Sequence, residues 1–291
     1  MIKNYLGPIY LTLAASIWGG MYVVSKMVLE FISPLELVWF RYVVALFTLG
    51  MIGFATHQSW HIHKRDIPLV IAMGLIGYFI SIWAQFAGTQ LSSAQMGAVI
   101  TSATPAFMVI FARILLKEKI TFRKKISVLL ATIGVLLIVG IGGIGDSFQL
   151  GGIILGIAAL TWALMSVIVK MIPNTYSILV ITTYAILVAT VVITPFVITQ
   201  INKEQMIYLF QPMVWGGILY LGIVSTAGAF FLWNKGLQLV DASRAGLYFF
   251  FQPLVGTLLG WLFLGEQVGM TFWLGTLLII GGVLLVINDE A

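Results

Sequence analysis

The 291-residue chain contains no cysteine, and only 9% of its residues are charged. Without cysteine it has no disulfide, no thiolate metal site and no cysteine nucleophile. A soluble globular domain carries about 25% charged residues, so the scarcity of charge excludes that class. The hydrophobic fraction of 60% and the mean hydropathy of +1.07 exclude a disordered chain. These values indicate an integral membrane protein.

Acidic residues are also few: the chain contains ten Asp and Glu, compared with 15 Lys and Arg. A membrane enzyme that modifies lipids would need acidic, His or metal-binding clusters at a membrane face, and here the acidic residues are scattered. The sequence has no paired intramembrane carboxylates, no nucleophile elbow and no phosphate-binding glycine loop. His57, His61 and His63 share one basic loop, where solvation explains them better than a metal site. We therefore expect no enzyme, metal or cofactor.

Hydrophobic runs alternate with short polar turns along the whole chain. A membrane-spanning helix needs about 20 apolar residues, and ten segments fit this requirement. They are residues 5–28, 34–55, 67–89, 94–116, 125–141, 151–171, 177–199, 213–235, 243–264 and 270–287. The expected fold class is an all-α integral membrane protein with ten transmembrane helices.

The basic residues predict how these helices are oriented. With a cytoplasmic N-terminus, all Lys and Arg except Lys26, Arg41 and Lys203 fall on the cytoplasmic side. Loops rich in Lys and Arg stay in the cytoplasm, so a multi-pass protein of the cell membrane with both termini inside is expected. The net positive charge therefore indicates cytoplasmic loops and not a nucleic-acid partner.

The second half of the sequence repeats the first. When the first helix is aligned with the sixth, Trp18 and Lys26 match Trp162 and Lys170. When the fourth and fifth helices are aligned with the ninth and tenth, Pro105 and Glu118 match Pro253 and Glu266. Chance similarity explains shared Leu and Gly, but it explains these matches poorly. The two copies, residues 5–141 and 151–288, hold five helices each, so the second copy enters the membrane from the opposite side. Secondary transporters often have such inverted repeats, with the substrate site at the repeat interface.

These features together resemble the drug/metabolite transporter superfamily, and specifically its EamA-type ten-helix exporters. The resemblance extends over the whole chain and rests on Trp18-Gly19, Lys26, Pro34, Arg41, Ala94, Pro105, Glu118 and Gly134, and on the echo Ala242, Pro253, Glu266 and Gly282. It implies two five-helix bundles around a central cavity. It also implies export of small metabolites such as amino acids, their derivatives or drugs, without naming the substrate.

Polar and aromatic residues on the first and sixth segments are the first candidates for substrate binding. Residues four apart lie on one helix face, and the two faces carry Trp18, Tyr22 and Lys26, and Trp162, Ser166 and Lys170. A ring beside a cation suits an amphipathic ligand with a carboxylate. The alternative is that both lysines extend to the membrane interface, because they lie near helix ends.

The third and eighth segments supply further candidates. Tyr78 and Gln85 lie on one face of the third, and Trp233 and Asn234 lie on the eighth. Such uncharged groups often only bond neighbouring helices. The resemblance places these two segments at the centre, and this favours a role in lining the cavity.

Pro105 and Pro253 lie inside the fourth and ninth segments, where each removes a backbone donor and kinks the helix. The carbonyl freed by Pro105, that of Thr101, should find a side-chain or water partner. We expect these kinks to be flexible points beside the substrate site, with packing kinks as the alternative. The neighbouring candidates for substrate contact are Thr101, Arg244, Tyr248 and Gln252.

The charged groups of the second segment predict a structural ion pair between Glu36 and Arg41. Glu118 and Glu266 end the fourth and ninth segments, where they are expected to cap loops. Close helix packing at Gly134 and at Gly281-Gly282, within or between chains, is compatible with a monomer or a homodimer.

The leading functional hypothesis is a secondary exporter of small molecules that works by alternating access in a lipid bilayer. A polytopic enzyme acting on lipids and a passive facilitator or channel are the alternatives. A channel would need repeated polar rings, and here polar groups are few and clustered. A cation facing a dry cavity at Lys26 or Lys170 could also link substrate to proton binding, so proton coupling stays open.

Overall fold

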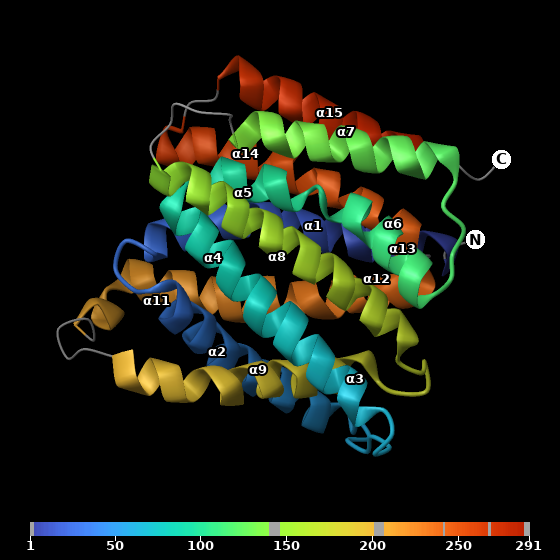
Figure 1. Cartoon of the computed structure of the whole chain (residues 1–291). Coiled ribbons are helices and arrows are strands. Elements are labelled where there is room, and N and C mark those ends of the chain that lie inside the picture. Colours follow the sequence, from blue (N-terminus) through green and yellow to red (C-terminus); the bar gives the residue numbers. More distant parts are fainter. Residues whose placement is uncertain (1–2, 140–145, 201–206, 241, 267–268, 288–291) are drawn as a thin grey trace.

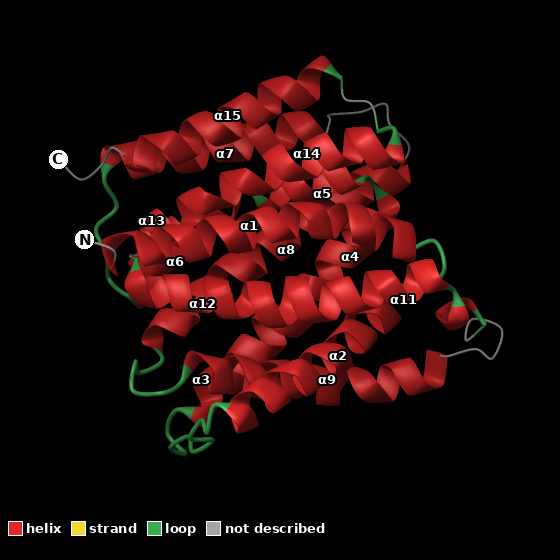
Figure 2. Cartoon of the chain, turned by 180° about the vertical axis from the view of Figure 1, so that it is seen from behind, coloured by secondary structure: helices red, strands yellow, loops and turns green. Residues whose placement is uncertain are grey.

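The computed structural model describes residues 3–139, 146–200, 207–240, 242–266 and 269–287, and within these ranges it is helical without any strand (Figures 1 and 2). The first half contains α1 (Lys3–Val28), α2 (Pro34–Ala55), α3 (Ile67–Ala72), η1 (Met73–Ser81), α4 (Ile82–Leu91), α5 (Ala94–Thr101), α6 (Thr104–Leu115) and α7 (Phe122–Val139). The second half begins with α8 (Asp146–Met171), α9 (Ile178–Gln200), η2 (Tyr208–Phe210), α11 (Pro212–Leu219) and η3 (Tyr220–Gly228). It continues with α12 (Ala229–Leu239), α13 (Ala242–Ala245), η4 (Gly246–Phe250), α14 (Phe251–Leu264) and α15 (Met270–Ile287).

Seven helices of the described residues are long and apolar enough to cross a membrane. They are Leu6–Val28, Pro34–Ala55, Ile67–Leu91, Ala94–Leu115, Ser147–Met171, Ile178–Gln200 and Pro212–Leu239. The other three expected spans correspond to α7, α14 and α15. Two of these contain the shorter apolar helices Phe251–Leu264 and Met270–Gly282. The third, α7, begins with the basic residues 123–125, which lower its apolar character.

The helices form a bundle in which α1 lies inside and packs against α12 and α14, while α8 packs against α4 and η1 (Figure 1). The pair α7 and α15 lies at one edge of the bundle, and α2 and α9 lie at the other. The start of α1 and the end of α15 are at the same end of the bundle, together with the loops 56–66 and 172–177. We call this end the terminal face.

The packing of α1 on α12 has a counterpart in the packing of α8 on α4. Gly236 of α12 leaves room for Leu11, and Gly88 of α4 leaves room for Leu155. A Cβ atom added at either glycine would lie 2.6 Å from the Leu side chain. The helices therefore approach closely through small residues, as is common between membrane helices. Each of these contacts joins the first half of the chain to the second.

Two π-helical segments, η1 and η3, occupy matching places in the third and eighth segments. A π-helix has wider turns than an α-helix, is rare, and often occurs at functional sites. In η3 the hydroxyl of Thr226 donates to the carbonyl of Leu221 at 2.6 Å, five residues back. The wider turns bring Tyr78 of η1 and Thr226 of η3 to buried positions inside the bundle.

The carboxylate of Glu266 caps the N-terminus of α5, which confirms the expected capping role. Its two oxygens accept the backbone N–H groups of Ala94 at 2.8 Å and Gln95 at 3.0 Å. Those N–H groups belong to the first turn of α5 and have no acceptor within the helix. The contact ties the loop before α15 to the fourth segment. One residue thus joins the two halves opposite the terminal face.

We expect the change Glu266→Ala to lower the free energy of unfolding by about 1 kcal/mol, since a helix cap is lost. For a chain of this size that corresponds to a decrease in unfolding temperature of about 2–4 °C. Thermal unfolding of the purified protein in detergent measures the effect. Glu30→Ala, at an exposed position at the same end of the bundle, is the control. Equal unfolding temperatures for the two variants would contradict the capping role.

Candidate functional site

Six aromatic side chains from five elements meet at the centre of the bundle, and we call them the aromatic cage: Trp18, Tyr78, Trp162, Phe230, Trp233 and Phe249. The rings of Trp18 and Trp162 lie edge to face with centroids 5.3 Å apart. The ring of Trp233 lies 5.3 Å from Trp18 and 4.4 Å from Phe249. Each such pair stabilises the packing by about 0.5–1.5 kcal/mol beyond area burial.

A small cavity lies beside these rings, with a volume of about 10 Å³. Its lining combines both halves of the chain: Trp18, Met21, Ile82, Gln85, Thr101, Thr104, Trp162, Phe230, Phe249 and Gln252. All ten side chains are buried, so the cavity is closed to solvent. It has room for about one water molecule. The structure thus has a closed centre, and any organic ligand requires the rings to separate.

The kink at Pro105 supplies polar groups to this cavity. The fourth segment is interrupted between Thr101, where α5 ends, and Thr104, where α6 begins. The freed carbonyl of Thr101 accepts the hydroxyl of Thr104 at 2.6 Å, which confirms the expected side-chain partner. The side chain of Thr101 lies 2.7 Å from the hydroxyl of Tyr22 and donates to Gln252 at 3.0 Å. The helix break before Pro105 in the first half is therefore bonded to Gln252, which precedes Pro253 in the second half.

The ninth segment is also irregular before its proline. The 3₁₀ segment η4 leads directly into α14, in which Pro253 is the third residue. The breaks in the two halves pack on each other, since a Cβ atom added at Gly246 of η4 would lie 2.8 Å from Cβ of Pro105. The 3₁₀ segment before Pro253 thus lies against the kink at Pro105, and Phe249 of this segment lines the cavity.

Asn234 bonds across the repeats on the far side of the cage. Its side-chain amide donates to the hydroxyls of Tyr78 and Thr182, both at 2.9 Å. Tyr78 stacks on Phe230 with centroids 4.5 Å apart. This network matches the alternative role weighed for these residues, namely hydrogen bonding between helices, while Tyr78 also contributes its ring to the cage.

Several buried polar atoms at the centre have no hydrogen-bond partner in the described part of the chain. They are the indole nitrogens of Trp162 and Trp233, the hydroxyl oxygen of Ser166 and the amide oxygen of Asn234. Buried polar groups are nearly always bonded, so each exception needs an explanation. All four residues were predicted to bind substrate, and of the four only Trp162 lines the cavity.

Arg41 is fully buried, and the predicted ion pair with Glu36 is wrong. The guanidinium donates through Nε to Thr226 at 2.6 Å, and more weakly to Ser225 at 3.4 Å. Glu36 instead accepts the backbone N–H of Ser33 at 2.7 Å and completes a capping box at the start of α2. The residues are five apart, and a helix turns through about 500° over that distance, so their side chains point in different directions.

The guanidinium of Arg41 lies among aromatic rings and not among carboxylates. Its central carbon is 5.0 Å from the ring centre of Phe86, 5.8 Å from Phe230 and 5.9 Å from Tyr42. A further contact joins it to the sulfur of Met21 at 3.5 Å. Phe230 and Met21 also line the cavity, so Arg41 is one side chain away from it.

The two lysines serve as helix caps, in place of either role weighed from the sequence. The ammonium of Lys26 donates to the carbonyls of Thr89, Gln90 and Ser92 at 2.8–3.0 Å, at the end of α4. Lys170 donates to the carbonyls of Leu237 and Val240 at 3.2 and 2.9 Å, at the end of α12. A cation at a helix C-terminus is favourable because free carbonyls point there. Neither lysine lines the cavity.

Two further candidates on the ninth segment are Arg244 and Tyr248, and Tyr248 is not among the described residues that line the cavity. Arg244 belongs to α13, but its side chain is outside the described part of the structure. Tyr248 is half-buried against the hydrophobic core. Sequence reasoning also missed the ring of Phe230. Its spacing of three residues from Trp233 places both on one helix face, a pattern that could have identified it.

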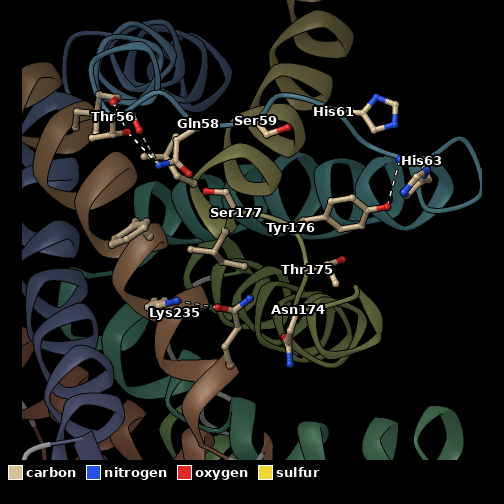
Figure 3. A pocket seen from close by; sticks show the side chains of 15 residues that line it. Thr56, Gln58, Ser59, His61, His63, Asn174, Thr175, Tyr176, Ser177 and Lys235 are labelled. Atoms are coloured by element: carbon tan, nitrogen blue, oxygen red, sulfur yellow. Dashed lines mark hydrogen bonds between the residues drawn. The ribbon is translucent and has the colours of Figure 1, made fainter.

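A larger pocket of about 770 Å³ opens at the terminal face between α2, α9 and α12 (Figure 3). Its wall is polar and includes Lys235, whose ammonium donates to Gln238 at 3.2 Å. The hydroxyl of Tyr176 donates to Asp66 at 2.6 Å and accepts the backbone N–H of His63. Partial desolvation and the bond to Asp66 raise the pKa of the Tyr176 hydroxyl. The hydroxyl therefore stays a protonated donor at neutral pH and holds two loops of different halves together.

We expect Arg41→Met to raise the unfolding temperature, because it removes a buried charge that has no counter-ion in the described structure. Burying such a charge costs several kcal/mol, whereas a residue of similar shape packs well, and the expected gain is about 1 kcal/mol or more. Arg41→Lys keeps the charge without the planar fork, so it should lower the unfolding temperature. A Met variant that unfolds several degrees below the unmodified protein would show that Arg41 is structural.

Comparisons with known proteins agree with the resemblance noted in the sequence. The model of the EamA-like transporter family matches residues 5–140 and again residues 149–288. The permease-like protein YdzE of Bacillus subtilis is 71% identical over 72 residues, which is 25% of this chain and 92% of YdzE. The transporter YetK of the same organism is 28% identical, over 99% of this chain and 88% of YetK.

Similarity extends to another organism and to solved structures. A transporter of Archaeoglobus fulgidus is 25% identical over 97% of this chain and 99% of its own length. A crystal structure of another protein matches with a TM-score of 0.72 at 18% identity, covering 98% of this chain and 99% of that one. The structural match concerns the fold alone. Since one family model matches both halves and covers nearly the whole sequence, this multi-pass membrane protein belongs to the EamA-like transporter family.

Proposed function

We propose that the protein is a secondary transporter that exports small organic molecules across the cell membrane by alternating access. Its ten helices form two inverted repeats, residues 5–141 and 151–288, with both termini in the cytoplasm. The substrate binds in the aromatic cage between the repeats. The observation that carries the proposal is the closed cavity, whose lining comes from both halves of the chain.

The arrangement of the cage supports a carrier rather than an open pore. Trp18 belongs to the first half and contacts Trp162, Phe230 and Trp233 of the second half. A relative movement of the two repeats would separate these rings and admit a ligand from one side. Transporters of this kind open their site by rocking one repeat against the other.

Irregular helices lie where such a movement needs them. The kink at Pro105 and the 3₁₀ segment before Pro253 pack on each other beside the cavity. Of the π-helical segments, η1 contributes Tyr78 to the aromatic cage and η3 contributes Thr226, which bonds Arg41. Irregular backbone inside a membrane is tolerated where it faces protein or a cavity, which is its place here.

The pocket at the terminal face supports an entry route from the cytoplasm. It opens between α2 of the first half and α9 and α12 of the second. Two bonds between the halves border it: Tyr176 to Asp66, and the hydroxyl of Tyr184 to the carbonyl of Trp60 at 2.9 Å. With a cytoplasmic terminal face, a substrate would collect in this pocket before the centre opens.

The first test compares the metabolites released by cells that overproduce the protein with those released by cells without it. We expect a defined set of small compounds to increase in the medium, and Trp18→Leu to abolish at least nine-tenths of the increase, since stacking by the central ring is lost. The control is Trp261→Leu, at a position on α14 that is 62% exposed. A medium unchanged by the unmodified protein would refute export, and equal activity of both variants would refute the site.

A second test uses the absence of cysteine from the chain. In Gly7→Cys with Leu239→Cys the Cβ atoms would lie 3.1 Å apart, and in Ser92→Cys with Gly151→Cys 3.0 Å apart. A shift below about 1 Å allows a disulfide in each pair. The pairs join the two halves at opposite ends of the bundle. We expect oxidation of either pair to stop transport of the compounds found above, and reduction to restore it.

The single cysteine variants are the controls, because they report any damage from the substitutions alone. Counterflow in proteoliposomes measures the exchange directly. Full exchange in both oxidised pairs would contradict alternating access and favour a passive facilitator.

A further inference from the structure

We propose that the substrate is an organic anion, in which a carboxylate on an apolar body pairs with Arg41 during transport. This inference rests on the proposed transport function and adds the chemical class of the cargo. The sequence had assigned Arg41 to an ion pair and the charge recognition to the two lysines. In the structure the lysines are bonded to helix ends, and Arg41 has no carboxylate partner among the described residues.

Arg41 is the buried charged residue, among the described side chains, that has no partner of opposite charge or helix cap to bond. Among the described side chains, the buried charged residues are Glu36, Arg41 and Asp66. Glu36 is used by the cap at the start of α2, and Asp66 is used by Tyr176 and by Arg65 at the terminal face. No described carboxylate lies within 4 Å of the guanidinium of Arg41. The centre of the bundle therefore carries an uncompensated positive charge.

The neighbours of Arg41 use only part of what the guanidinium offers. It has five N–H groups. One short bond reaches Thr226, the contact to Ser225 is long at 3.4 Å, and the bond to Met21, at 3.5 Å, goes to a thioether sulfur, which is a weak acceptor. Contacts with aromatic rings return about 0.5–2 kcal/mol each, while burying a cation costs several kcal/mol. An arginine in this position lowers the stability of the fold unless an anion binds to it during the transport cycle.

The guanidinium of Arg41 lies close to the cavity, and the side chains beside it can change conformation. Met21 and Phe230 each line the cavity and contact Arg41, so one side chain bridges the two. Methionine adapts its shape easily because it is unbranched. Separation of the rings that opens the cage for a ligand therefore also exposes the N–H groups of Arg41. A carboxylate matches their planar fork with two parallel bonds.

The unpartnered polar group that lines the cavity favours an acceptor, whereas the unpartnered amide oxygen of Asn234 does not line the cavity. The indole nitrogen of Trp162, which lines the cavity, has no partner, and indole can only donate. Trp233 has the same free donor one ring away. The cavity lining contains no carboxylate that could receive an amine. A cationic substrate would be repelled by Arg41, whereas an anion would satisfy the charge and the free donors together.

The aromatic walls decide between organic and inorganic anions. A small inorganic anion would leave the six rings without a partner, whereas a flat apolar body stacks on them and gains from their burial. The combination of one cation with several rings therefore suits a carboxylate on an aromatic or other planar apolar group. A polyanion would need more than one cation, and the cavity lining offers none beyond Arg41 behind it.

The test sorts the compounds exported in a Trp18-dependent manner by their net charge at pH 7, using ion-exchange separation of the medium. It compares the unmodified protein with Arg41→Gln, Arg41→Lys and the control Lys64→Gln, whose side chain is in the exposed loop 56–66. We expect anions to dominate the exported set. Arg41→Gln should lower their export at least tenfold, Arg41→Lys should keep a measurable part, and Lys64→Gln should change nothing.

Four results would overturn the inference. The first is a Trp18-dependent set made mainly of neutral or cationic compounds, and the second is export of anions by Arg41→Gln at the unmodified rate. The third is equal loss of anionic and neutral cargo in Arg41→Gln while its unfolding temperature is unchanged. A general loss in all Arg41 variants with lowered unfolding temperatures would assign the residue to folding and also refute it. Absence of any exported compound would instead refute the transport function itself.

Discussion

Backbone N–H and C=O groups without a partner are costly inside a lipid bilayer, and the rest of this structure depends on how that cost is avoided. At several helix ends and at one helix break, a side chain satisfies the freed groups. Lys26 and Lys170 bond the last carbonyls of α4 and α12, and Glu266 bonds the first N–H groups of α5. At the kink before Pro105 the hydroxyl of Thr104 has the same role. Nearly all of these bonds join segments that are distant in the sequence.

Once the ends and breaks are satisfied, the interior can be apolar and almost free of charge. The core is formed by aromatic and aliphatic side chains, and the cavity between the halves is reduced to about 10 Å³. Arg41 is the exception, because its guanidinium is buried among rings and has no described carboxylate within 4 Å. Duplicated Trp residues make the cage similar in both halves, whereas this single cation makes it asymmetric. In the proposed transport cycle, the repeated scaffold opens towards either side and the single cation selects an anionic cargo.

Much of the candidate site follows from the repeated sequence. Matching positions in two copies predicted Trp18, Trp162, Pro105 and Pro253. The structure brings the two Trp rings together at the cavity and packs Pro105 against η4, whereas Pro253 lines a separate pocket. The spacing of Tyr22 from Trp18 likewise predicted its contact with the kink, because residues four apart share a helix face. Charged residues were the least predictable. A charge can reach several partners around a helix, and the sequence does not show which helix end or ring lies within range.

The sequence by itself determined the membrane class, the helical fold, the division into two similar halves and the family, because hydrophobic length and matched positions are local properties of the chain. Only the tertiary structure decided that Lys26 and Lys170 cap helices, that Glu36 caps its own helix, and that Arg41 stands alone among rings. It also decided that Phe230 and Met21 close the centre. These outcomes depend on which helices lie side by side and at what rotation. Packing between distant segments sets both, and composition and periodicity within one segment do not contain that information.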